Sequence, residues 1–226
     1  MTIKNSLLVG MVTLFLAGCT MEEVSTDTYT STFTSTKSIS VENTTGNLNI
    51  TKWDNNYIEV KATKKAVFKD DASDVTVSIT DEETYSIKTV YPDYCNGVSV
   101  DYEIKIPASI NIKATITTGN ITINGGELAS GIETTTGDIK VLNTKYTGNV
   151  KCTTGNISAE IWDLTNDCTI QSTTGNITAS VKTENYKKIR TEVTTGNISN
   201  NFVAETGNGT YSIYLKLTTG NIDVNK

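Results

Sequence analysis

The side chains of this chain restrict the chemistry that it can perform. Its 226 residues include no histidine, one arginine (Arg190) and four cysteines, with 25 acidic and 19 basic residues and a formal net charge of −6. The absence of histidine excludes Ser-His-Asp and Cys-His catalytic sites and imidazole metal sites. An acidic chain with a single arginine is also poorly suited to nucleic acid, so we expect no nucleic-acid partner. Carboxylates and thiols remain as candidates.

Acidic residues form two clusters in the N-terminal half, at residues 70–74 and 81–83. Calcium prefers oxygen ligands, so both clusters are candidate cation sites. They lack the glycine-punctuated Asp spacing of calcium-binding loops, and the sequence favours solvated, charged turns. We therefore predict no metal site and no cofactor.

The first eighteen residues are organised like an export signal. Lys4 precedes the apolar run LLVGMVTLFL, and Leu16-Ala17-Gly18 leads directly into Cys19. A run this short does not span a bilayer as a helix, which takes about 20 residues. The pattern resembles the lipobox of exported lipoproteins, in which the cysteine becomes the lipidated mature N-terminus. It implies a signal peptide over 1–18 and a protein anchored to a membrane through a lipid on Cys19. The alternative is an ordinary secretory signal with an incidental Cys19.

Threonine accounts for 41 of the 226 residues, about 18% against a usual value of roughly 5–6%. Only 19% of the chain is charged and only two residues are proline. β-Branched residues favour strands, so this composition indicates β structure and argues against both a disordered tail and a helical bundle.

The motif Thr-Thr-Gly-Asn/Asp-Ile, with close variants, recurs along the chain. From residue 119 onward its glycines are separated by 18, 18, 20, 21 and 24 residues. Apolar and polar residues alternate on both sides of each glycine, which is the period of a β-strand. Gly followed by Asn or Asp supplies the backbone freedom for a corner between two strands. The motif glycines are Gly46, Gly119, Gly137, Gly155, Gly175, Gly196 and Gly220.

Eighteen residues of extended chain are about 60 Å long, which fits one coil of two or three short strands. We therefore predict an all-β fold, a single-stranded parallel β-helix or β-solenoid with coils of 18–24 residues. Stacked coils would bury columns of Ile and Val, including Ile157, and would align Thr and Asn in ladders with a spacing of about 4.8 Å. The longer steps are assigned to insertions at the far corners, at residues 162–167 and 183–188.

The N-terminal half is predicted as a less regular β portion without a helix. Residues 19–36 are interpreted as the lipidated N-terminus and a Thr/Ser-rich tether, although residues 29–35 favour a first edge strand. The domain organisation is thus a signal peptide at 1–18, a tether at 19–36 and a β-solenoid domain at 37–226. Strands are expected at 38–41, 48–51, 57–62, 75–79, 84–90, 98–106 and 110–116.

Four positions before the glycine, every coil carries a polar residue that is predicted to face outward. The mixed charges of this column indicate stabilising pairs between neighbouring coils. A catalytic pair formed by Glu133 and Glu192 would span three coils, about 14 Å, whereas glycosidase carboxylates lie about 5–9.5 Å apart. We therefore predict no catalytic residue. The column consists of Thr115, Glu133, Lys151, Gln171, Glu192 and Lys216.

The other cysteines fit no zinc motif. Cys152 and Cys168 differ by four residues in their position along the coil, about 13 Å, which exceeds the roughly 4.4–6.8 Å between the Cα atoms of a disulfide. Both are expected to be reduced and Cys152 to be buried, whereas pairing of Cys95 is left open. Glycosylation is also left open, because the corner composition alone produces Asn-x-Ser/Thr sequences. These begin at Asn43, Asn49, Asn120, Asn156, Asn176, Asn197 and Asn208.

The order of these segments resembles the family of putative adhesin domains with β-strand repeats found in exported bacterial and archaeal proteins. The Thr/Ser-Gly-Asn/Asp-Ile/Val corners and the apolar-Pro step at Ile106-Pro107 carry this resemblance, which covers residues 36–226. It implies a single-stranded parallel β-solenoid. The family has no catalytic motif to transfer.

Together these patterns predict a lipid-anchored protein of the cell envelope, exposed outside the cytoplasm, that is not an enzyme. The expected role is adhesion, surface interaction or an envelope scaffold, with the membrane as a partner through Cys19 and a surface glycan or protein as ligand. Residues 112–226 carry 10 acidic and 10 basic groups, so a ligand there would be held mainly by hydrogen bonds and shape. The alternative is a carbohydrate-active β-helix enzyme, a lyase or a hydrolase.

Overall fold

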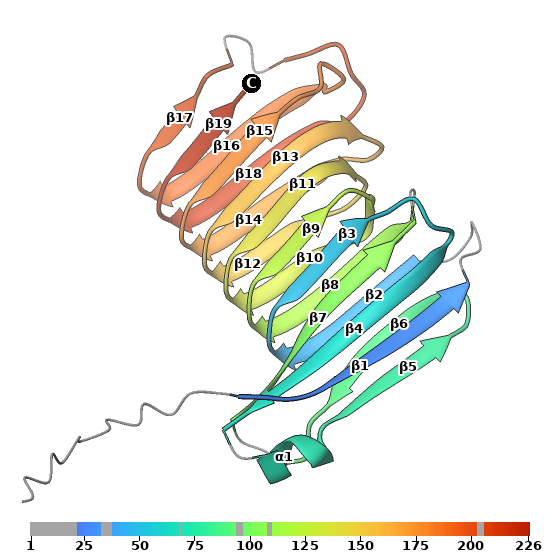
Figure 1. The fold of residues 1–226 in the computed structure, drawn as a ribbon. Coiled ribbons are helices and arrows are strands. Elements are labelled where there is room, and N and C mark those ends of the chain that lie inside the picture. The colour runs from blue at the N-terminus through green and yellow to red at the C-terminus, as the bar shows by residue number, and fades with distance from the viewer. Residues whose placement is uncertain (1–21, 33–37, 68, 94–96, 108–109, 203–205) are drawn as a thin grey trace, which may run out of the picture.

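The computed structural model describes residues 22–32, 38–67, 69–93, 97–107, 110–202 and 206–226. These residues form nineteen strands and one short helix (Figure 1). The strands build two large and mostly parallel sheets that pack face to face, so the predicted all-β class is confirmed. Within these ranges, no helix combines the length and the apolar character that crossing a membrane requires.

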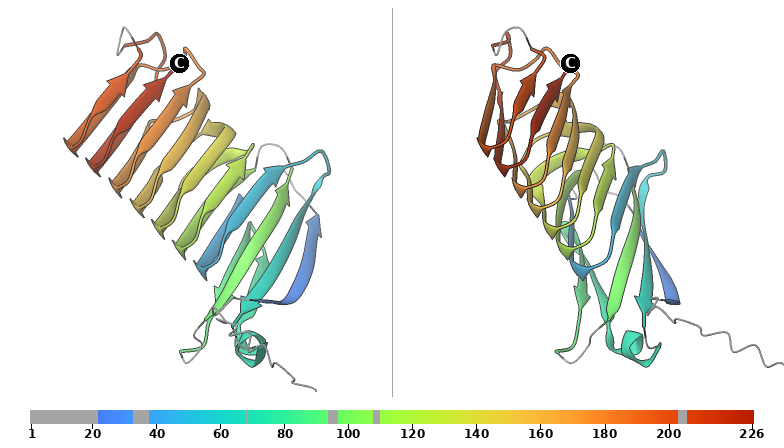
Figure 2. Two further views of the ribbon diagram at one scale, coloured as in Figure 1. Left: turned by 60° about the vertical axis from the view of Figure 1, so that its left-hand side comes forward. Right: turned by 90° about the vertical axis from the view of Figure 1, so that its left-hand side faces the viewer.

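Each repeat contributes one strand to each sheet, and the Gly-Asn/Asp corner joins the two. Equivalent residues lie side by side in parallel pairs, which gives the regular array seen in Figure 2. In spatial order the first sheet contains β2 (Ser38–Thr45), β8 (Asn111–Thr118), β10 (Glu127–Thr136), β12 (Val150–Thr154), β14 (Cys168–Thr174), β18 (Ser212–Thr219) and β16 (Lys188–Thr195). The second contains β3 (Leu48–Lys52), β9 (Ile121–Asn124), β11 (Ile139–Tyr146), β13 (Ile157–Leu164), β15 (Ile177–Val181), β19 (Ile222–Asn225) and β17 (Ile198–Asn200).

The corner glycine is required by close backbone contact. Gly155 has a φ of +145°, in a region that residues with a side chain rarely adopt. A β-carbon added there would overlap the carbonyl oxygen of Gly137 in the neighbouring repeat. The Gly155 N–H donates to the Thr174 carbonyl at 2.9 Å, and the Ile157 N–H donates to the Asn176 carbonyl at 2.8 Å. Adjacent repeats can therefore approach to hydrogen-bonding distance at the corner only if the side chain is absent.

The core lies between the two sheets and consists of stacked columns of aliphatic side chains. Inward positions on both sides of the corner are almost fully buried, as the sequence alternation predicted, except in the terminal repeat of β16 and β17. One column, two residues after the glycine, contains Ile121, Ile139, Ile157, Ile177 and Ile222. Non-directional burial of this kind is the main favourable term in folding.

The last two repeats stack in the reverse of their sequence order. β14 pairs with β18, and β16 pairs with the other edge of β18. The expectation that successive coils simply follow one another is therefore wrong at this end. Side-chain polarity explains the exchange: Leu215, Leu217 and Val224 occupy the inner repeat. Their equivalents in the terminal repeat are Thr191, Val193 and Asn200. These side chains are less apolar, so less free energy is lost when one side of the repeat is exposed to solvent.

The N-terminal portion mixes parallel and antiparallel pairs, because β6 (Thr84–Val90) and β7 (Val98–Ile106) join the stack in parallel and the strands outside them pair antiparallel. β4 (Tyr57–Ala66) pairs antiparallel with β7, which extends the second sheet beyond β3. β6 continues the first sheet beside β2, and β5 (Thr76–Asp81) pairs antiparallel with β6. The predicted less regular β portion is thus confirmed.

Two local features differ from the prediction. A short helix, α1 (Lys69–Asp74), occurs where none was expected, and it leads into the buried Val75 with Ala72 also buried. The first strand, β1 (Glu22–Thr32), begins seven residues before the expected Tyr29 and pairs antiparallel with the whole length of β4. Much of the segment 19–36 that was interpreted as a tether therefore belongs to the sheet.

Replacement of Ile157 by Asp tests the buried column. Ile157 is only 1% exposed, and an unpaired carboxylate there would cost about 4 kcal/mol or more. We expect Ile157→Asp to lose the cooperative thermal transition in circular dichroism. The matched control is Ser158→Asp on the outward face of the same strand, which should change stability by about 0.5 kcal/mol or less. Equal melting temperatures for the two variants would contradict the register.

Replacement of Gly155 by Ala tests the corner. Because the added methyl group meets a backbone carbonyl, we expect Gly155→Ala to lower the free energy of unfolding by about 3 kcal/mol or more in urea titrations. Gly97 is the matched control, since its φ is also positive, at +76°, but its nearest neighbour would be a Val67 methyl at 3.5 Å. Gly97→Ala should cost about 1 kcal/mol. Similar losses in both variants would show that backbone conformation alone, and not the stacking contact, selects glycine.

Candidate functional site

A ladder of Asn and Asp side chains runs along the corner edge. The backbone N–H of each corner Asn or Asp donates to the side-chain Oδ1 of the residue in the neighbouring repeat. The Asp138 N–H donates to Asn120 Oδ1 at 2.8 Å, and the Asn156 N–H donates to Asp138 Oδ1 at 2.7 Å. The ladder follows the spatial order of the repeats, so the Asn221 N–H donates to Asn176 and the Asn197 N–H to Asn221. Its eight members are Asp101, Asn47, Asn120, Asp138, Asn156, Asn176, Asn221 and Asn197. The predicted Asn ladder is confirmed, and its side-chain oxygens accept hydrogen bonds from backbone N–H groups.

Asn43 shows that the Asn-x-Ser/Thr sequences differ in their surroundings. Its side chain is only 6% exposed and donates to the carbonyls of Thr45 and Val100 at 3.1 and 2.8 Å. It also accepts a hydrogen bond from the Tyr91 hydroxyl at 3.0 Å. Such a side chain is not accessible to glycosylation in the folded protein.

The outward polar column forms side-chain contacts of the expected kind but does not bring carboxylates together. Glu192 accepts a hydrogen bond from the Tyr214 hydroxyl and lies 3.6 Å from Lys216. Both contacts lower the pKa of Glu192, the Tyr214 hydrogen bond more strongly. Because of the reversed order of the last two repeats, Glu133 is separated from Glu192 by four strand pairings, about 19 Å, so the separation is larger than the three coils expected from the sequence.

The described thiols are buried and unreactive. Cys152 and Cys168 are free and each is 1% exposed, which confirms the prediction that Cys152 is buried. Burial raises the pKa of Cys168 to about 12, and it also raises the pKa of Cys152. The thiolate form that nucleophilic chemistry needs is therefore suppressed at neutral pH. Cys19 and Cys95 lie outside the described residues.

The acidic clusters lie at the N-terminal end, in α1 and in the turn between β5 and β6. Asp81, Glu82 and Glu83 are exposed, as expected for a charged turn. In the part of the chain that the structure describes, no group of three or more Cys, Asp or Glu residues is arranged to hold a metal ion.

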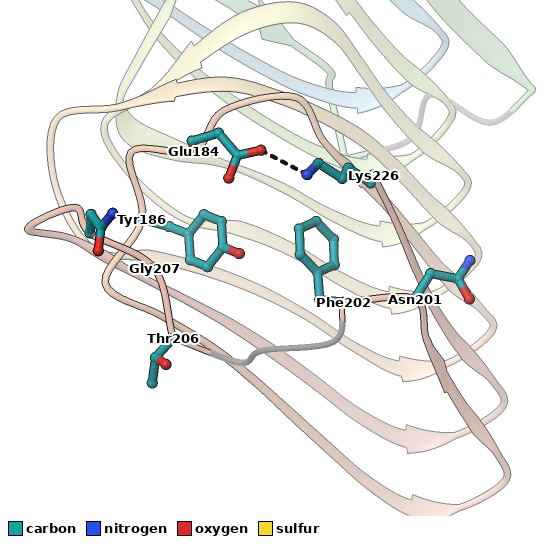
Figure 3. Close-up of a pocket in the computed structure, with 8 residues that line it drawn as sticks. Glu184, Tyr186, Asn201, Phe202, Thr206, Gly207 and Lys226 are labelled. Carbon is teal, nitrogen blue, oxygen red and sulfur yellow. Dashed lines mark ion pairs between the residues drawn. The ribbon is translucent and has the colours of Figure 1, made fainter.

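A pocket of about 340 Å³ opens at the C-terminal end of the stack, among the loop before β16, the segment after β17 and the end of β19 (Figure 3). This volume is within the range of small-molecule sites. The rings of Tyr186 and Phe202 meet edge to face, with centroids 5.7 Å apart. Glu184 and Lys226 form an ion pair of 2.9 Å beside them. Its eight lining residues are Glu184, Tyr186, Asn201, Phe202, Thr206, Gly207, Asn208 and Lys226.

Backbone contacts hold the wall of this pocket in place. The Gly207 N–H donates to the Lys187 carbonyl at 3.1 Å and the Gly209 N–H to the Tyr186 carbonyl at 2.9 Å. A β-carbon at either glycine would overlap the backbone around Tyr186. The Asn201 side chain donates to Asn225 Oδ1 at 2.9 Å. Two segments distant in sequence are thereby fixed on either side of the aromatic pair.

The sequence did not identify this pocket. It located residues 183–188 correctly as an insertion at a far corner, but it did not bring them to the residues that follow β17. The available signal was the pair of longest repeat steps, 21 and 24 residues, together with the degenerate motif Thr206-Gly207-Asn208. Tyr186 is an aromatic residue in the otherwise polar segment 183–188, and Phe202 begins the apolar run Phe202-Val203-Ala204 after the next repeat. Apolar residues in insertions between repeats indicate a local contact.

The arrangement suits binding better than catalysis. The partly exposed Phe202 ring offers apolar surface, and carboxamide, hydroxyl and charged groups at its margin offer hydrogen bonds, a combination that fits a polar molecule with an apolar face. Glu184 is the one carboxylate side chain among the eight lining residues, and it is already paired with Lys226. A pocket with one carboxylate side chain does not reproduce the two-carboxylate geometry of glycoside hydrolysis.

Comparison with known proteins agrees with this class of all-β repeat protein. The model of the Toastrack DUF4097 family matches residues 34–225, and the chain belongs to this family. A search of curated proteins finds no match.

Solved structures with a similar arrangement have names that refer to adhesion. A "putative cell adhesion protein" from Clostridium sporogenes is 13% identical, with a TM-score of 0.52 over 90% of this chain and 99% of that one. A "putative adhesin" from Bacteroides fragilis is 11% identical, with a TM-score of 0.32 over 88% and 97%. The first of these shares the fold.

Proposed function

We propose that this protein is a lipid-anchored component of the cell envelope, exposed outside the cytoplasm, that acts without catalysis in adhesion, surface interaction or as an envelope scaffold. The repeats act as a single-stranded β-solenoid whose last two coils are exchanged in order. The C-terminal pocket carries the proposal, because it presents the partly exposed Phe202 ring, packed against the buried Tyr186, and several hydrogen-bonding groups at the end of the stack.

The proposal assigns the ligand to surface glycans. A sugar ring has an apolar face that stacks on aromatic side chains and a rim of hydroxyls that carboxamides and charged groups can bind. Asn208 and Lys226 supply such groups in the lining that they share with Phe202. An exposed peptide of a surface protein is the second candidate, and its apolar side chains would use the same rings.

A carbohydrate-active enzyme is the competing function, and two observations argue against it. Glu133 and Glu192 are too far apart to act on one glycosidic bond. Glu192 is also held by Tyr214 and Lys216, which lower its pKa and so oppose a role as general acid. The names of the structural neighbours support a role in adhesion.

Replacement of Cys19 by Ser tests the anchor. We expect the wild-type chain to fractionate with membranes and Cys19→Ser to leave them, since the lipid-accepting thiol is lost while the folded domain is unchanged. The measurement is immunoblotting of soluble and membrane fractions, with protease resistance of the released chain as the check on folding. Cys95→Ser is the matched control and should stay with the membranes. Membrane retention of Cys19→Ser would contradict the lipoprotein assignment.

A glycan array with the purified protein tests the pocket. We expect binding to a subset of polysaccharide fragments, weakened about tenfold or more by Phe202→Ala, because the stacking surface is removed. The matched control is Trp162→Ala, which removes an exposed aromatic ring, 52% accessible, on β13. Three outcomes would contradict the assignment. Binding could be lost in the Trp162→Ala control alone, new reducing ends could be released from the glycans, or the protein could capture peptides in place of glycans.

A further inference from the structure

The outward face of the first sheet is basic over the strands β12, β14, β18 and β16. Four of the five charged side chains that face away from the core on these strands are basic. Acidic groups of the same region are placed elsewhere, with Asp138 in the corner ladder and Asp163 beside Lys145 at 3.7 Å. The fold thus separates charges that balance in the sequence of residues 112–226. The five side chains are Lys151, Lys188, Arg190, Lys216 and the acidic Glu192.

The exchange of the last two repeats determines which charges become neighbours on this face. If the repeats stacked in sequence order, Glu192 of β16 would lie beside Gln171 of β14. Because β18 takes that place, Lys216 is in register with Gln171, and Glu192 moves to the end of the column. Lys151 is in register with Gln171 on the other side. A lysine therefore stands on each side of Gln171, with the two lysine Cα atoms about 10 Å apart.

These three side chains line a hollow of about 110 Å³. Thr173 and Thr218, which are exposed, add hydroxyl groups to its lining. Among the described residues that line the hollow there is no carboxylate side chain. The volume is well below the roughly 300–1,000 Å³ of sites that enclose a small molecule, so the hollow suits a single group of a larger ligand.

Both lysines are available to a ligand. In the part of the chain that the structure describes, Lys151 forms no ion pair, although Glu133 is its neighbour on β10. Lys216 lies 3.6 Å from Glu192, but their side chains are 50% and 48% exposed, and exposed ion pairs contribute little free energy. Glu192 also accepts a hydrogen bond from the Tyr214 hydroxyl. An anion can therefore bind the two ammonium groups without breaking a strong contact.

We propose that this hollow binds one anionic group, a carboxylate or a sulfate, of an acidic polysaccharide that lies across the outward face of the first sheet. A lysine carries a compact charge with three donors on a flexible stem, so the two ammonium groups can approach the same anion from opposite sides. The Gln171 amide and the threonine hydroxyls supply further donors to its oxygens. The site shares no lining residue with the C-terminal pocket and goes beyond the function proposed for it.

The surroundings of the hollow favour a polymer over a compact ligand. Thr153, Thr173 and Thr218 occupy the same exposed position in three adjacent strands, which repeats hydroxyl groups at about 4.8 Å. Arg190 lies over the Tyr214 ring at 5.6 Å and places the next basic group along the same face. A nucleic acid is less favoured, because the chain has a net charge of −6 and a single arginine.

Titration calorimetry of the purified protein with three soluble polymers tests the site. Polygalacturonate presents carboxylates, dextran sulfate presents sulfates, and neutral dextran is the control. We expect binding to one or both of the acidic polymers and none to dextran, and the polymer that binds identifies the anionic group. Affinity should fall at least about fivefold between about 0.05 and 0.5 M salt, because the charges are exposed to solvent.

Charge-neutralising variants locate the site. Lys151→Gln and Lys216→Gln should each weaken binding at least about fivefold, because one of the two ammonium groups is lost. The matched control is Lys140→Gln, which changes the net charge equally at an exposed position on β11 in the second sheet and should leave the affinity unchanged. Glu192→Gln removes the carboxylate nearest to Lys216 and should strengthen binding at least about twofold. Unchanged melting temperatures verify the fold of the variants.

Each contrary outcome overturns the proposal in a different way. Absence of binding to both acidic polymers would overturn the site itself. Equal losses in Lys140→Gln and Lys151→Gln would show that net charge, and not the hollow, governs binding, and weaker or unchanged binding by Glu192→Gln would contradict its location. Tighter binding to a double-stranded oligonucleotide would assign the face to nucleic acid. Phe202→Ala should leave binding to the acidic polymers unchanged, so failure of the C-terminal pocket is distinguishable, whereas a loss in this variant would place them in that pocket.

Discussion

The close approach of glycine backbones at the corners is the constraint on which the rest of the structure depends. A β-carbon at the corner would overlap the glycine carbonyl of the neighbouring repeat, and this holds at Gly119, Gly137, Gly155, Gly175 and Gly220 alike. With the side chain absent, the glycine N–H groups donate to threonine carbonyls of the next repeat at 2.9–3.1 Å. Strands on both sides of the corner then stack in parallel register, which aligns the buried columns and the Asn ladder.

This constraint also explains why composition says much about architecture and little about function. The corner Asn and Asp side chains, apart from the terminal Asn197, accept a backbone hydrogen bond. Buried polar residues such as Thr134 and Ser172 donate to the glycine carbonyl of the neighbouring repeat at 3.3 Å. Cys152 makes the same contact through its thiol. Residues that would suggest chemistry in another fold are therefore occupied by the stacking itself. Features for recognition must lie where the repeat pattern ends or is interrupted.

The fold was predictable from the sequence wherever one local pattern determined it. The Gly-Asn corners, the alternation beside them and the limits of β6 and β7 follow from periodicity alone. The exchange of the last two repeats was not predicted, because stacking order depends on which repeat is more apolar inside. A comparison of Thr191 and Asn200 with Leu215 and Val224 could have indicated it. The pocket was missed for a related reason. The exchange determines where the chain runs after β17, and this course of the chain brings Phe202 into contact with Tyr186.

The two ends of the stack consequently have different physical roles. The N-terminal end is covered by antiparallel strands, with β1 along β4 and β4 along β7. Six strand pairings, about 29 Å, separate β2 from β16 at the other end. A stack of this length holds the aromatic pocket away from the end that β1 and β4 cover. If a lipid on Cys19 fixes the first end to a membrane, the exchange of the last two repeats places the less apolar repeat, and with it the features suited to recognition, at the end that faces outward.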